Sequence, residues 1–161
     1  VNHANGTTFP VTVIVNHLKA MTGVDDPSAG SNGWATKGAR DRAKRQKQAE
    51  DLANLVQARH VGAPAERIIL VGDFNAYEFN DGYVDMVNVI AGTPTADSQT
   101  VVPGDGIDLV DPDFVNLLAT APAAERYSYT YDGSAQAIDQ TARMRNAAWR
   151  RVCLLVVMKE A

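Results

Sequence analysis

The chain has 161 residues, of which 45% are hydrophobic and 21% charged, as expected for an ordinary globular domain with a single core. Its formal net charge of −4 excludes a basic field over the whole molecule that would attract nucleic acid non-specifically. Its only cysteine is Cys153, which excludes an internal disulfide.

The first predicted strand covers Phe9 to Val15, a stretch rich in β-branched residues that leads into Asn16-His17-Leu18-Lys19. A histidine at the end of a strand, beside a lysine, is suited to donate a hydrogen bond to a phosphate oxygen. A surface histidine that caps a loop is the competing interpretation. Residues 21–38 are polar and rich in Gly, Ser, Asn and Asp, which predicts a long connection.

A helix is predicted over Ala39 to Arg59, because small and apolar residues recur there at spacings of three and four. The face expected to turn inward consists of Ala43, Gln46, Ala49, Leu52, Ala53, Leu55 and Val56. The opening turns are strongly basic, with Asp41 as the only acid among residues 37–47, and positive charge there opposes the helix dipole. We therefore expect Arg42 or Arg45 to meet an anion, a solvated cationic face being the alternative.

The central predicted strand is the uninterrupted apolar run Ile68 to Val71, which is typical of a strand buried on both faces. Gly72 ends the run. If extended geometry continued to Asn75, alternation would place Asp73 and Asn75 on one side and Phe74 on the other. Hard oxygen ligands at a strand end are suited to hold Mg²⁺, or a water against a phosphorus atom. The competing interpretation is an Asp/Asn turn without chemistry.

The elements predicted after the central strand are short. A helix is expected at Tyr83 to Ile90 and a second helix at Phe114 to Leu118, with a turn-rich excursion at residues 92–113 between them.

A hairpin is predicted next. Tyr127 to Tyr131 alternates as a strand does, Asp132-Gly133 is a strong two-residue turn signal, and Ala135 to Ile138 returns to deliver Asp139. From Gln140 onward the composition changes, with four arginines among residues 141–151 and an apolar run at residues 152–158.

Four of these features occur in the order and spacing of a known family. They are the first strand with its Asn16-His17-Leu18-Lys19 end, the basic helix with Arg45, the pentapeptide Gly72-Asp73-Phe74-Asn75-Ala76, and the hairpin that ends in Ile138-Asp139. Over about residues 10–139 the chain resembles the endonuclease/exonuclease/phosphatase superfamily, and in particular bacterial secreted or surface nuclease domains. Those domains also follow the pentapeptide with aromatic and acidic residues, as residues 77–83 do here.

The resemblance implies an α/β fold of the deoxyribonuclease I-like (DNase I-like) type, a four-layer sandwich of two mixed β-sheets flanked by helices. It implies hydrolysis of a phosphodiester by metal-assisted, in-line attack of water, with Mg²⁺, Mn²⁺ or Ca²⁺ as the cofactor. By similarity Asp73 orients or deprotonates the water and approaches the metal, and Asn75 fixes the phosphate or a metal-bound water. His17 would donate to a non-bridging oxygen, and Asp139 would support the catalytic histidine or the metal site.

The resemblance also implies a nucleic acid substrate, DNA or RNA, with Arg42 and Arg45 as candidate phosphate contacts. Two alternatives stay open: a phospholipid or inositol-phosphate phosphodiesterase of the same superfamily, and a catalytically inactive binding or scaffold module. Secretion or display on a bacterial surface is expected from the resemblance alone. No stretch resembles a signal peptide or a membrane span.

The chain departs from the family pattern in several places. The family's N-terminal asparagine and metal-binding glutamate would precede anything present here, no Ser-Asp-His motif occurs, and Gln140 stands where many relatives have a histidine. We therefore expect residues 1–139 to form a partial domain with about half of its active site, followed by an atypical tail at 140–161 from a shifted reading frame or a fragment end. Because Val1 is not methionine, we expect a processed product or a fragment. We expect little or no turnover from this chain alone.

Overall fold

The computed structural model describes residues 6, 8–104 and 106–145, which form a mixed α/β fold. Among these residues are a four-stranded sheet, a two-stranded hairpin and two α-helices. The elements in chain order are β1 (Thr12–His17), α1 (Lys37–Gly62), β2 (Ile68–Asp73), α2 (Met86–Ala91), β3 (Phe114–Asn116), β4 (Tyr129–Tyr131), β5 (Ser134–Gln136) and β6 (Asp139–Met144), with 3₁₀ turns at Asp97–Gln99, Leu118–Thr120 and Ala123–Glu125.

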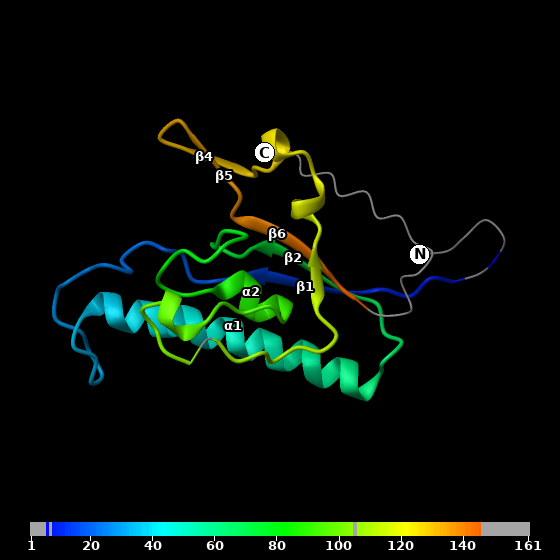
Figure 1. Ribbon diagram of the computed structural model, residues 1–161, viewed down its shortest axis with the longest axis horizontal. Coiled ribbons are helices and arrows are strands. Elements are labelled where there is room, and N and C mark those ends of the chain that lie inside the picture. Colours follow the sequence, from blue (N-terminus) through cyan, green and yellow to red (C-terminus); the bar gives the residue numbers. More distant parts are fainter. Residues whose placement is uncertain (1–5, 7, 105, 146–161) are drawn as a thin grey trace.

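The four-stranded sheet has the order β1-β2-β6-β3. Strands β1 and β2 are parallel, joined through α1, whereas β6 runs antiparallel to both β2 and β3. Figure 1 shows α1 and α2 on the same side of the sheet, while the β4–β5 hairpin projects beyond the end of β6. One face of the sheet is therefore covered by helices.

The core lies between the sheet and α1 and α2. Ile68 and Leu70 of β2 are fully buried against Ala49, Ala53 and Val56 of α1 in one cluster of apolar side chains. The predicted inward face of the helix is confirmed for Gln46, Ala49, Leu52, Ala53 and Val56, which are buried. The other two predicted members differ: Leu55 is 49% exposed and Ala43 is only half-buried. The buried face also includes two charged residues in the opening turns, Asp41 and Arg45.

Gly72 has a conformational role at the end of β2. Its φ is +125°, and a Cβ atom there would lie 2.1 Å from the carbonyl oxygen of Asn16 in β1. Only glycine tolerates both the backbone angle and this close approach. Gly72 thus lets the last residues of β1 and β2 lie side by side.

The second face of the sheet is open on β1. Val13 and Val15 are 54% and 76% exposed, although their neighbour Ile14 packs against the core. Alternation along the strand puts Val13, Val15 and His17 on this outer face. No described helix covers it in Figure 1.

Of the short elements predicted after the central strand, two are confirmed and one is wrong. The hairpin forms as expected, with positive φ at both Asp132 and Gly133, the conformation of a type I′ turn. The helix predicted at 83–90 is present as α2. The helix predicted at Phe114 to Leu118 is instead the strand β3 followed by a 3₁₀ turn, because β6 offers a pairing edge that local propensity does not report.

Strand β6 crosses the boundary expected after residue 139. Residues 139–143 pair with β2 and residues 142–144 pair with β3, so the first part of the expected tail belongs to the sheet. The rest of that tail, residues 146–161, lies outside the described residues. Within the part of the chain that the structure describes, no helix combines the length and apolar character that a bilayer span needs.

Candidate active site

His17, Asp73 and Asp139 lie in one row across three neighbouring strands. His17 is the register partner of Asp73 in the parallel pair β1–β2, and Asp73 is the register partner of Asp139 in the antiparallel pair β2–β6. Residues in register share a face of the sheet. We call these three residues the polar row; the sheet brings them together at the ends of β1 and β2 and the start of β6.

The contact between His17 and Asp73 in the polar row is open to solvent. His17 Nε2 lies 3.6 Å from Asp73 Oδ2, and the two side chains are 79% and 33% exposed. This separation is too long for a hydrogen bond, and an exposed pair of this kind contributes only about 0–1 kcal/mol to stability. Both side chains therefore remain available to a ligand.

Asp73 and Asp139 place two carboxylates directly across one antiparallel register position. Side chains at such positions have Cβ atoms about 4.5–5.5 Å apart, and like charges there repel one another. The carboxylate of Asp139 makes no hydrogen bond or ion pair with any described residue, whereas its backbone N–H donates to Ser128 Oγ at 3.0 Å. A cation between the two carboxylates would relieve this repulsion.

Asn75 is held in a turn, and the extended geometry considered for it ends at Asp73. Its φ is +48°, and its backbone N–H donates to Asp73 Oδ1 at 2.8 Å. This is the Asp/Asn turn given above as the competing interpretation. The Asn75 side chain donates to the carbonyl of Leu18 at 3.0 Å, and Phe74 is buried in the core, on the side opposite the polar row. Asn75 therefore ties the loop after β2 to the loop after β1.

Arg45 was expected to contact a substrate phosphate, but it is fully buried. It donates to the carbonyl oxygens of Lys19 at 2.6 Å and Asn75 at 2.9 Å, and to Asp81 Oδ2 at 3.2 Å. A phosphate in solvent has no access to this guanidinium. Burial lowers the pKa of Arg45, and the nearby Asp81 carboxylate opposes that shift. The anion that Arg45 meets is thus Asp81, and its role here is to position both site loops.

Arg42 is also committed within the protein. It donates to the carbonyl of Val24 and lies over the ring of Tyr83, 5.6 Å from the ring centroid. Its contacts join the long connection before α1 to the segment that precedes α2. These contacts give Arg42 a structural role and do not support the predicted phosphate contact.

One face of α1 supports the turn that follows His17. The backbone N–H of Lys19 donates to Gln48 Oε1 at 2.8 Å, and Lys19 Nζ lies 3.4 Å from Asp41 Oδ2. Burial alone would raise the pKa of Asp41, but Arg40 and Lys19 outweigh it and hold that pKa below its ordinary value. The basic start of α1 is therefore explained by intramolecular partners.

Gln140 is a positioning residue that the sequence analysis did not assign. It is 1% exposed, and its Nε2 donates to the carbonyls of Ala76 at 3.0 Å and Ala137 at 2.8 Å. Its Oε1 accepts from Asn116 Nδ2 at 2.9 Å. Gln140 thus fastens the loop after β2 to the base of the hairpin. Alternation from Asp139 would have predicted this inward position.

Among the described residues, no group of three or more His, Cys, Asp or Glu side chains is arranged to hold a metal ion. The paired carboxylates of Asp73 and Asp139 are the donors with the chemistry that Mg²⁺ prefers, and water commonly completes such sites. The donor chemistry therefore fits a weakly held divalent cation with several water ligands. Comparison with known proteins returned no matching family, curated protein or solved structure.

Proposed function

We propose that this chain is part of a metal-dependent phosphodiester hydrolase of the nuclease type, with the polar row as its reacting edge. The observation that carries the proposal is the register of His17, Asp73 and Asp139 on three strands at one end of the sheet. Few structural roles require a histidine and two carboxylates in one solvent-exposed row, because exposed charges add little stability. Substrate hydrolysis does require acid, base and metal-binding groups together.

The residues of the polar row would have different roles in the proposed reaction, set by their chemistry. Asp73 and Asp139 would hold the divalent cation, which when bound offsets phosphate charge and lowers the pKa of a coordinated water. Asp73 Oδ2 is oriented because its other oxygen is held by the Asn75 backbone N–H. His17, 79% exposed, would donate from its imidazole to a non-bridging oxygen as negative charge accumulates there. Arg45, Asn75 and Gln140 act only by keeping the loops in place.

We further propose that the fold is the four-layer arrangement of the deoxyribonuclease I-like type, with a second sheet over the outer face of β1 and β2. The exposure of Val13 and Val15 supports it, because β-branched residues on a sheet favour a packed environment. By the same resemblance, the metal-binding glutamate and the Ser-Asp-His motif that are absent here would come from other segments of the full domain. This chain alone is therefore expected to bind metal more readily than it turns over substrate.

The test is a Mn²⁺ titration followed by NMR, because Mn²⁺ broadens the resonances of nearby nuclei. We expect selective broadening at His17, Asp73 and Asp139, and at least about tenfold weaker binding in Asp73→Asn and in Asp139→Asn. Asp132→Asn, at the tip of the hairpin, is the matched control and should bind as the wild type does. Broadening that spreads evenly over surface carboxylates would overturn the assignment.

A plasmid-nicking assay with Mg²⁺ separates the remaining possibilities. We expect little or no nicking by this chain alone. Robust nicking that Asp73→Ala abolishes would show that the chain already contains a working site. Metal binding at the polar row without hydrolysis, even in a longer parent protein, would favour an inactive binding module.

A further inference from the structure

Two pairs of aromatic side chains present stacked rings near the polar row. Tyr77 and Phe79 have centroids 5.1 Å apart with planes 9° apart, and Phe79 is 61% exposed. Tyr129 and Tyr131 have centroids 6.4 Å apart with planes 18° apart, and they are 47% and 63% exposed. We call these four residues the aromatic surface.

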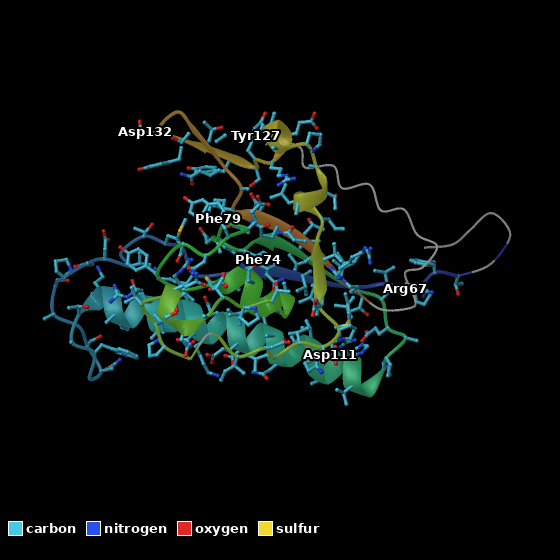
Figure 2. All side chains as sticks on the ribbon, viewed as in Figure 1. Arg67, Phe74, Phe79, Asp111, Tyr127 and Asp132 are labelled. Carbon is cyan, nitrogen blue, oxygen red and sulfur yellow. The ribbon has the colours of Figure 1, made fainter. Side chains whose placement is uncertain are left out.

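The two pairs come from segments that are fastened to each other. Glu78, which lies between Tyr77 and Phe79, pairs with Arg126 at 3.7 Å, and Arg126 lies three residues before β4. The side chain of Gln140 also joins the two segments, because it donates to the carbonyl of Ala76, next to Tyr77, and to the carbonyl of Ala137, just after β5. Figure 2 shows Phe79 between the end of the sheet and the segment that runs from Tyr127 to Asp132 at the tip of the hairpin. Both aromatic pairs are therefore held at the end of the sheet where the polar row lies.

The hairpin is anchored to the polar row itself. Ser128 lies between Tyr127 and Tyr129, and its hydroxyl accepts the backbone N–H of Asp139. Its own backbone N–H donates to the carbonyl of Gln136 and closes the base of the hairpin. The position of the tyrosines relative to Asp139 is thus fixed by hydrogen bonds on both sides of Ser128.

Packing does not account for these rings. Every residue of β4 is exposed, and the hairpin is a separate two-stranded sheet, which in isolation is marginally stable. Large exposed aromatic residues that are grouped together are typical of binding surfaces. An aromatic face stacks favourably on a nucleobase whatever the base, because every base has a π-face.

We propose that the aromatic surface binds unpaired nucleobases, so that single-stranded DNA or RNA is the substrate class presented to the polar row. This inference rests on the proposed function for the choice of a phosphodiester-linked ligand. Bases within a duplex are stacked on one another and cannot stack on these rings without being extruded. The net charge of −4 means that phosphate attraction adds little, so base stacking carries the affinity.

The experiment measures fluorescence anisotropy of a labelled, single-stranded oligothymidylate in the presence of Mg²⁺, with gel analysis to show that the strand stays intact. Tyr129→Leu, Tyr131→Leu and Phe79→Leu remove the ring but keep an apolar side chain. We expect each variant whose ring stacks on a base to bind about 5- to 150-fold more weakly. Trp34→Leu is the matched control, because Trp34 is an aromatic residue 43% exposed in the connection before α1.

Probes of different chemistry decide the outcome. An abasic strand with the same phosphates should bind more weakly than oligothymidylate and should not distinguish the variants. Equal binding of the abasic strand, tighter binding of duplex, or full affinity in all three variants would overturn the inference. This outcome is separable from that of the proposed function. If Asp73→Asn leaves Mn²⁺ binding unchanged while the ring variants still weaken oligothymidylate binding, the proposed metal site is wrong and the inference about the aromatic surface stands.

Discussion

Arg45 shows at the scale of one residue how a buried charge organises a candidate site. Its guanidinium holds the loop after β1 through Lys19 and the loop after β2 through Asn75, and it balances its charge with Asp81. Asp81 also accepts the backbone N–H groups of Tyr83 and Val84. The ion pair therefore connects α1 to both loops that border the polar row.

We predict that Arg45→Met destabilises the fold by about 3–5 kcal/mol, because it leaves the Asp81 carboxylate buried without its cation. Chemical denaturation followed by circular dichroism measures this loss. A double variant, Arg45→Met with Asp81→Asn, should recover part of it, since the unpaired charge is gone. Equal stability of Arg45→Met and the wild type would show that the pair is not formed in solution.

At the scale of the element, α1 begins where the long connection folds back on it. Thr36 caps the helix by accepting the N–H of Ala39, and the backbone N–H groups of Lys37 and Gly38 donate to the carbonyls of Ser28 and Asp26. The Asp26 side chain reinforces this junction. Hydrogen bonds from Ser28, followed by the contact with Lys37, lower its pKa from 3.8 to about 2.

A pH dependence follows for this junction. Because the pKa of Asp26 is lower in the folded state, its contribution to stability is present above about pH 4 and is lost as the pH falls through about 2. NMR titration of the Asp26 carboxyl carbon should show this low midpoint. Ser28→Ala should move the midpoint upward, toward the ordinary value. A midpoint that stays near 4 in the wild type would contradict the hydrogen-bond arrangement.

At the scale of the whole molecule, the two faces of the sheet are unequally covered. Ile14 and Val15 are neighbours in β1, yet Ile14 faces the core and Val15 is 76% exposed. We predict that Ile14→Thr costs about 1–3 kcal/mol by placing a hydroxyl against the core. Val15→Thr should change stability by no more than about 0.5 kcal/mol.

This neighbouring pair also tests the four-layer proposal. Both substitutions keep a β-branched residue, so strand propensity is matched and the difference reports coverage of each face. Thermal denaturation of the two variants measures it. If Val15→Thr proves as costly as Ile14→Thr in this chain, the outer face is already covered in solution. In a longer parent protein with the second sheet, we expect that equality.

The sequence by itself determined most of the local elements and supplied the candidate site residues. Periodicity predicts the strands β1 and β2 and the small-residue face of α1, and turn preferences predict the Asp132-Gly133 turn. Both signals act over a few residues. His17 and Asp73 stand at predicted strand ends and Asp139 follows the predicted hairpin, but their assignment to one site came from the resemblance of the surrounding motifs to a known family. A histidine and two carboxylates are side-chain types suited to bind a phosphate and a metal ion.

Only the tertiary structure decided how these pieces are combined. Register between strands distant in sequence aligned the polar row, and pairing with β6 turned Phe114–Asn116 into a strand. The structure also moved Arg45 from a predicted substrate contact to a buried support of the site. The physical reason is common to all three: burial and cross-strand pairing depend on residues far away along the chain, and no local pattern carries that information.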